Sequence, residues 1–118
     1  FAIIDGVEGM EGNGPIRGTA VNHKVALASF DPMAVDSICC QLMDIPLEYV
    51  GYLNYNAAAD IGIIDREKID IIGSAKPSDH VIKYALHSNA ESQLEWDDPL
   101  TPPSSRPQVQ QPAQKPVQ

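Results

Sequence analysis

Cysteine, positive charge and long apolar runs are all scarce in this chain of 118 residues. No apolar run approaches the roughly 20 residues that a membrane-spanning helix needs, so we expect no membrane span in this segment. The cysteines are Cys39 and Cys40, and neighbouring positions on a helix point about 100° apart, which places them poorly for a mutual disulfide. Because nothing resembles a disulfide framework, the composition favours a reducing compartment and a cytoplasmic location.

The scarcity of positive charge excludes one class of partner. The chain has 8 lysines and arginines against 16 aspartates and glutamates, and its formal net charge is −8. All the acidic residues lie between Asp5 and Asp98. Such a body repels phosphate backbones, so we expect no nucleic-acid binding, whereas a divalent cation or a small molecule remains compatible with it.

Composition divides the chain into two parts. Residues 1–98 carry structured apolar patterns, whereas residues 99–118 are rich in proline and glutamine and have hardly any large apolar side chain. We expect the first part to be an α/β domain and the second a disordered tail, which could bind a protein partner. Because the chain opens at Phe1 inside an apparent strand, we also expect it to be a fragment of a larger domain, its sheet completed by strands upstream.

The order of elements predicts a small sheet with crossover helices. Strands are expected at Phe1–Ile4, Val21–Ser29 and Lys68–Gly73. A helix starts at Pro32 with Asp31 as its cap and a buried stripe that includes Cys39, and a second follows Pro46 and runs through Ala58, with Gly62 as its left-handed cap. A short last helix is expected over His80–His87. Whether the first two strands run parallel or form a hairpin is left open by the sequence.

The segment "DGVEGMEGNGPIRG" between the first two predicted strands concentrates glycines and carboxylates. Backbone without side chains lets a ligand approach closely, and carboxylate oxygens suit hard cations. This predicts a metal site at Asp5, Glu8 and Glu11. A tight turn at Asn13-Gly14 in a purely structural loop is the alternative. The ligand-binding residues predicted here are Asp5, Gly6, Glu11, Gly12, Asn13, Gly14 and Gly18.

The start of the first helix, "FDPMAVD", could complete this site. Asp31 is explained as a helix cap, whereas Asp36 lies off the apolar stripe and a ligand or solvent would account for it. We predict that Asp31 and Asp36 join the glycine-rich loop in one ligand site, provided that the first two strands run parallel.

Taken together, "IIDGVEGMEGNGPIRGTAV", "ASFDPMAVDSICCQLM" and "IGIIDREKIDIIG" resemble the domain of unknown function 362 family, and specifically the C-terminal half of that domain, from Ala2 to about Gly73. The resemblance implies an uncharacterised, prokaryotic-type protein whose relatives often carry 4Fe-4S clusters in a ferredoxin-like module. This chain has no cysteine cluster of that kind, so an iron–sulfur cofactor would require an upstream module.

Two functions follow from these observations. The first is a ligand- or divalent-metal-binding domain, either a redox-linked domain or an enzyme, with its site in the glycine- and acid-rich loop. The second is a non-catalytic scaffold or protein-interaction domain, in which the loop is structural, Asp31 only caps the helix and the tail binds a partner. The sequence leaves open whether the protein is an enzyme.

Overall fold

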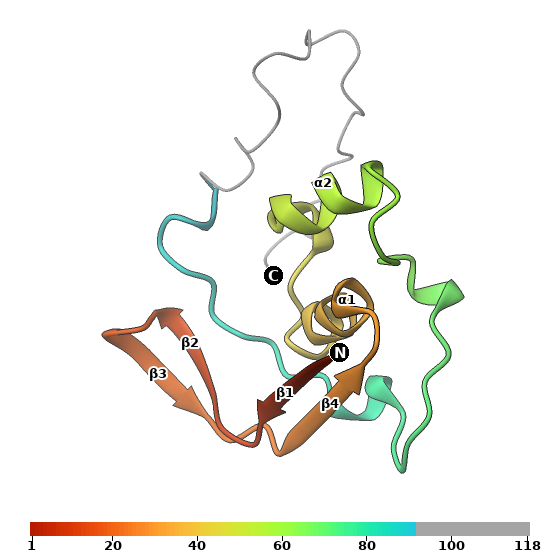
Figure 1. Cartoon of the computed structure of the whole chain (residues 1–118). Helices are drawn as coiled ribbons and strands as arrows, with labels where there is room; N and C mark the ends of the chain where they lie inside the picture. The colour runs from red at the N-terminus through yellow and green to blue at the C-terminus, as the bar shows by residue number, and fades with distance from the viewer. Residues whose placement is uncertain (92–118) are drawn as a thin grey trace, which may run out of the picture.

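The four strands of residues 1–91 form one long, bent, two-stranded ribbon. In the computed structural model, which describes residues 1–91, β1 (Ala2–Gly6) pairs antiparallel with β4 (Val25–Ser29), and β2 (Gly9–Asn13) pairs antiparallel with β3 (Arg17–Val21). The β2–β3 hairpin is therefore nested between the two outer strands, and Figure 1 shows it projecting away from them. The question of strand direction is settled as antiparallel.

The bend in the ribbon falls where its two arms differ in length. Residues 7–8 join β1 to β2, whereas residues 22–24 join β3 to β4, so one arm has an extra residue, as in a β-bulge. Lys24 absorbs the difference with a left-handed φ of 62°, and its N–H donates to the Val7 carbonyl at 2.9 Å. The strand predicted over Val21–Ser29 is therefore wrong as one continuous strand, because this bulge divides it into the end of β3 and the whole of β4.

Helix α1 (Pro32–Leu42) covers one face of the β1–β4 ribbon. Its start agrees with the prediction, with Asp31 as the cap and Pro32 in the first turn. Cys40 is buried while Cys39 is only half-buried, so the prediction that Cys39 belongs to the core is wrong. Helix α2 packs against α1, and its Tyr52 bonds to Asp36, one turn before Cys40. Both cysteines are free.

Helix α2 (Gly51–Ala58) follows the 3-10 helix η1 (Leu47–Tyr49) and buries Leu53 completely. The second helix was thus predicted correctly, but its cap was not. The left-handed residue next to its end is Asp60, with a φ of 55°, and Gly62 lies further along. Gly62 does adopt a left-handed φ of 74°, in close packing against Met33 and Asp31, where a side chain would collide.

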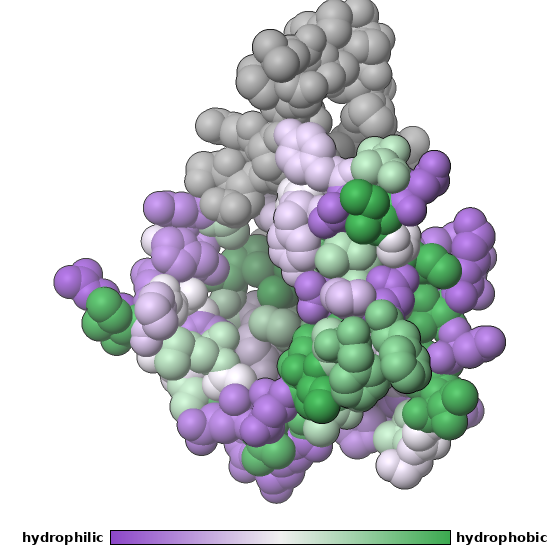
Figure 2. All heavy atoms as spheres, in the orientation of Figure 1, coloured by the Kyte–Doolittle hydropathy of each residue, from purple (hydrophilic) through white to green (hydrophobic). Residues whose placement is uncertain are grey.

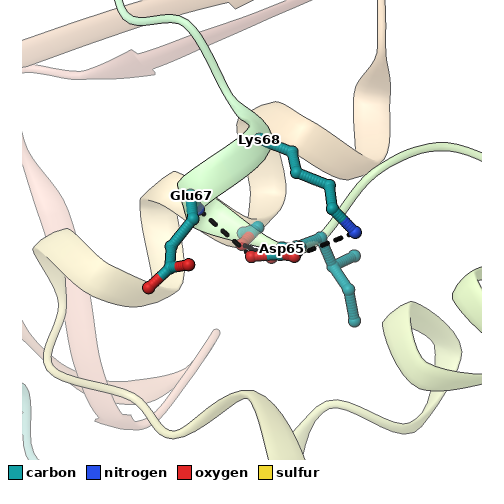
Figure 3. Close-up of polar contacts among 5 residues, drawn as sticks. Asp65, Glu67 and Lys68 are labelled. Carbon is teal, nitrogen blue, oxygen red and sulfur yellow. Dashed lines mark hydrogen bonds and ion pairs between the residues drawn. The ribbon is translucent and has the colours of Figure 1, made fainter.

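The chain after α2 is largely irregular. Asp65 caps the 3-10 helix η2 (Arg66–Lys68): its side chain accepts from the Glu67 N–H at 3.1 Å and pairs with Lys68 at 3.2 Å (Figure 3). These contacts with Lys68 and Glu67 lower the pKa of Asp65. The strand predicted over Lys68–Gly73 is absent, because this segment makes no ladder of hydrogen bonds with β4 or any other described strand.

The last described segment ties the parts together without forming the helix predicted over His80–His87. Within residues 77–87 the helical part is η3 (Pro77–His80). The N–H groups of Ile82 and Tyr84 instead donate to the carbonyls of Leu42 and Met43, at 2.8 and 3.0 Å. They satisfy acceptors that the end of α1 leaves free, which favours an extended path over a helix.

Residues 1–91 thus form a small α/β fold with two two-stranded sheets and two α-helices. No helix within residues 1–91 combines the length and the apolar character needed to cross a bilayer. The predicted tail, residues 99–118, lies outside the described residues.

Candidate functional site

The antiparallel register separates the two halves of the predicted ligand site. Asp5 lies opposite Ala26, whereas Ser29 lies opposite Ala2 and Asp31 follows Ser29. Three residues of strand, about 10 Å, therefore separate the level of Asp5 from the end of β4 that leads to Asp31. The expected convergence of Asp5 and Asp31 at one rim required parallel strands, and the hairpin rules it out.

The carboxylates and glycines of the predicted loop make local or structural contacts. Asp5 accepts from the Val7 N–H at 3.1 Å in a tight turn. Glu11 Oε2 accepts from the Ala85 N–H at 2.7 Å. Asn13 Oδ1 accepts from the N–H of Ser88 at 2.8 Å, so β2 holds the segment after η3 against the hairpin.

The glycines serve the same hairpin. Gly12 has a φ of 73° and donates its N–H to the Ala85 carbonyl at 2.8 Å. A Cβ atom on Gly9 would lie only 2.2 Å from the Tyr84 hydroxyl, so the close approach that glycine permits is to this tyrosine. Gly6 ends β1, Gly18 lies within β3, and Asn13-Gly14 leads into the turn of the hairpin, which is the structural alternative considered for this loop.

Among residues 1–91, no group of three or more His, Cys, Asp or Glu side chains is gathered so that it could hold a metal ion. Asp5, Glu8 and Glu11 accordingly form no such cluster. A ligand-binding role of the loop residues taken singly stays a prediction.

The two aspartates of the predicted helix start also have intramolecular partners. Asp31 Oδ1 accepts from the Met33 N–H at 2.8 Å, and Oδ2 accepts from the Ile63 N–H at 2.8 Å. Asp31 therefore caps α1 and fastens the chain after α2 to it. Asp36 accepts from the Tyr52 hydroxyl at 2.6 Å. Burial, and then this bond to Asp36, raise the pKa of Tyr52.

A buried histidine that no sequence pattern had indicated as functional connects the bulge to the last segment. His23 Nε2 lies 2.8 Å from the His80 carbonyl, and Nδ1 lies 2.9 Å from the Tyr84 hydroxyl. A carbonyl can only accept, so Nε2 carries the proton and Nδ1 accepts from Tyr84. Burial, and then the charge of Glu11, raise the pKa of Tyr84, which keeps this hydroxyl a donor. The partners are 61 and 57 residues apart in the chain, so no local pattern could reveal them.

A groove of about 390 Å³ lies elsewhere in the described part of the chain, and we call it the β4 groove. One wall is the edge of β4, from Lys24 to Ser29, and the floor is the apolar face of α1. The other wall is the segment 69–77, together with His80. In Figure 1 this segment runs along the side of the ribbon opposite the β2–β3 hairpin. The α1 residues of the floor are Ala34, Val35, Ile38 and Leu42.

The β4 groove combines apolar side chains with open main chain. Among the described residues β4 has one strand neighbour, β1, so its other edge presents unpaired N–H and C=O groups. On the opposite wall Ile72 is 97% exposed. Sequence reasoning missed this groove because it took residues 68–73 for a paired strand. The apolar residues of this run, Ile69, Ile71 and Ile72, were the sequence signal that could have indicated the groove.

A second apolar surface lies where β1 begins and β4 ends, visible as the large green area near the centre of Figure 2. Phe1, Ile3 and Phe30 are all exposed there, and the two phenylalanine rings meet edge to face at 5.2 Å. Among residues 1–91, the face of the β1–β4 ribbon that carries Ile3 is therefore exposed.

Comparison with known proteins gives one finding. No curated protein and no solved structure matches the chain. A family model does match, over a shorter stretch than the motifs from Ala2 to about Gly73. Residues 1–41 match the model of the family described as Domain of unknown function (DUF362), so the resemblance is confirmed from β1 through most of α1, and this part of the chain is similar to that family.

Proposed function

We propose that this chain is a non-catalytic protein-interaction domain that takes an extended segment of a partner protein into the β4 groove. The observation that carries the proposal is the open edge of β4 beside an apolar floor. An added strand would bond to the main chain of β4 and lay alternate side chains on α1, which is the recognition mode called β-augmentation.

The composition of β4 supports this use of its edge. Natural edge strands are usually protected by charged residues, proline or a bulge. The sequence of β4 is Val-Ala-Leu-Ala-Ser, without charge or proline, and the bulge lies before it. The strand has five residues, about 16 Å, which suits a short peptide. The size of the groove also lies within the range of ordinary ligand sites, about 300–1,000 Å³.

The polar contacts of the predicted loop favour the same class of function. Asp31 caps a helix, Asp36 holds Tyr52, and Glu11 fastens the segment after η3. These structural contacts are those expected of the interaction-domain hypothesis rather than of a metal or redox centre. The tail as a further partner-binding segment stays a prediction.

The test uses a dansylated, amidated pentapeptide of alternating valine and threonine, which favours an extended conformation. Peptide binding should slow amide hydrogen exchange in Val25–Ser29, measured by mass spectrometry. Ile72→Glu should weaken binding at least 10-fold. Ile16→Glu should not, since Ile16 is 90% exposed in the hairpin turn and lies outside the groove.

Three results would contradict the proposal. They are no binding at millimolar peptide, protection confined to β1, or equal effects of the two isoleucine variants. A fourth result would also overturn it, namely that β4 is protected by a second copy of the chain in a dimer that Ile72→Glu abolishes. The groove would then serve self-association instead of a partner protein.

A further inference from the structure

The β4 groove carries its positive charge at one end. Lys24 directly precedes β4, and Lys76 begins the turn that leads into η3. The end of η3 lies close to Lys24, because the His80 carbonyl bonds to the side chain of His23. Lys24, Lys76 and His80 all line the groove, and Asp70 is the acidic residue among its lining.

Both lysines are free of carboxylate partners within residues 1–91. The ion pair found there joins Lys68 to Asp65, and both of these residues precede the groove-lining segment 69–77. Asp70 is the acidic residue that lines the groove, and Asp79 lies on a neighbouring hollow beside Lys76. In a chain of net charge −8, the groove is lined by two lysines without carboxylate partners and by one aspartate, so its lining carries a small net positive charge.

The backbone of Lys24 points to the same end. A left-handed φ of 62° suits glycine or asparagine, while a lysine there is strained. Such outliers gather at binding sites, where the surrounding structure compensates for the strain. The bulge explains why a left-handed residue is needed at this position but not why it is a lysine.

We infer that the β4 groove selects an extended segment with a carboxylate at one of its ends, the end that lies beside Lys24 and Lys76. This inference rests on the proposed function. The carboxylate comes either from an aspartate or glutamate side chain or from the C-terminus of the partner. Its attraction to two exposed lysines is screened by salt, so the preference is strongest at low ionic strength.

The experiment compares four dansylated peptides by fluorescence anisotropy in 20 mM and 500 mM NaCl. The first is the neutral, amidated valine–threonine peptide. The second and third are amidated and carry an added aspartate at one end or the other. The fourth is the neutral sequence with a free C-terminal carboxylate. We expect one carboxylate-bearing peptide to bind about 3- to 10-fold more tightly than the neutral one at low salt, with the difference lost at high salt.

Lys24→Asn is the decisive variant, because asparagine tolerates the left-handed conformation and the fold should keep its melting temperature or gain slightly. It should abolish most of the carboxylate preference, measured for each variant as the ratio of its affinities for the carboxylate-bearing and the neutral peptide. Lys83→Asn, an exposed lysine outside the groove, is the matched control and should preserve the preference.

The outcomes separate the two proposals. If all four peptides bind equally and protect β4, the charge selectivity is wrong and the protein-interaction function stands. If no peptide binds, both are wrong. A carboxylate preference that survives Lys24→Asn and Lys76→Gln would also overturn the inference, because the charge that attracts the peptide would then lie elsewhere. A preference seen only with the free C-terminus would support the inference and assign the carboxylate to the partner's terminus.

Discussion

Replacing Asp31 tests whether this residue stabilises the fold, as its contacts indicate, or contributes little to stability and is available to bind a ligand. One carboxylate oxygen caps α1, and the other accepts from the Ile63 N–H. Losing an N-cap costs about 1 kcal/mol, and losing a hydrogen bond of the second kind costs a similar amount. Asp31→Ala should therefore lower the free energy of unfolding by about 2 kcal/mol, or the melting temperature by about 10 °C in a domain of this size.

Asp31→Asn separates the two contributions. Asparagine is a good cap, but its single oxygen cannot serve both N–H groups, and its NH2 group would face the Ile63 donor. We expect about half the loss seen with alanine, measured by urea denaturation and thermal melting. Glu8→Ala removes a carboxylate that is exposed and should change stability by less than about 0.5 kcal/mol.

The reasoning fails if Asp31→Ala is as stable as Glu8→Ala, or if the asparagine and alanine variants are equally unstable. The first result would free Asp31 for the ligand role predicted from the sequence. The second would mean that the bond to Ile63 contributes everything and the helix cap nothing. Because Asp31 does not line the β4 groove, its variants should bind the neutral peptide as the original chain does.

Three further outcomes are expected. Gly9→Ala should lower the melting temperature by several degrees, because its methyl group would collide with Tyr84, whereas Gly73→Ala, which has open space, should not. Burial, and then the charge of Asp36, raise the pKa of Cys39 to about 11. At pH 8 iodoacetamide should therefore alkylate Cys39 about 100-fold more slowly than it alkylates glutathione, with both rates measured by mass spectrometry. Equal rates would contradict the burial of this thiol. Glu11→Gln keeps an oxygen acceptor and should leave the melting temperature nearly unchanged; loss of measurable magnesium binding by calorimetry in this variant would instead support the metal site predicted at the loop.

The local elements of the fold could largely be read from the sequence, because their signals lie within a few residues. The Asp31-Pro32 start of α1, the run from Val50 to Ala58 and the apolar strand at the N-terminus depend on capping, periodicity and turn chemistry. The glycine-rich segment was harder, since a loop around a ligand and a nested hairpin use the same residues. The alternative of a tight turn at Asn13-Gly14 comes near the structure, in which the turn lies at residues 14–16, but the strands β2 and β3 on either side of it were not predicted.

The direction of the first two strands decided the predicted site, and no short-range signal carried it. Once β1 and β4 are antiparallel, Asp5 and Asp31 belong to different ends of the ribbon. The contacts of Glu11 with Ala85, of Asp31 with Ile63 and of His23 with Tyr84 join residues tens of positions apart, so each carboxylate's partner could not be foreseen.

By itself the sequence determined an acidic α/β body, similar over its first 41 residues to a known family, with a capped first helix and free cysteines. Only the tertiary structure decided where the chain is open to a partner. The edge of β4 and the segment 69–77 form a groove because of how they lie across α1. Hydrophobic periodicity tells which face of a strand is buried, but whether its edge is paired depends on which other segment reaches it.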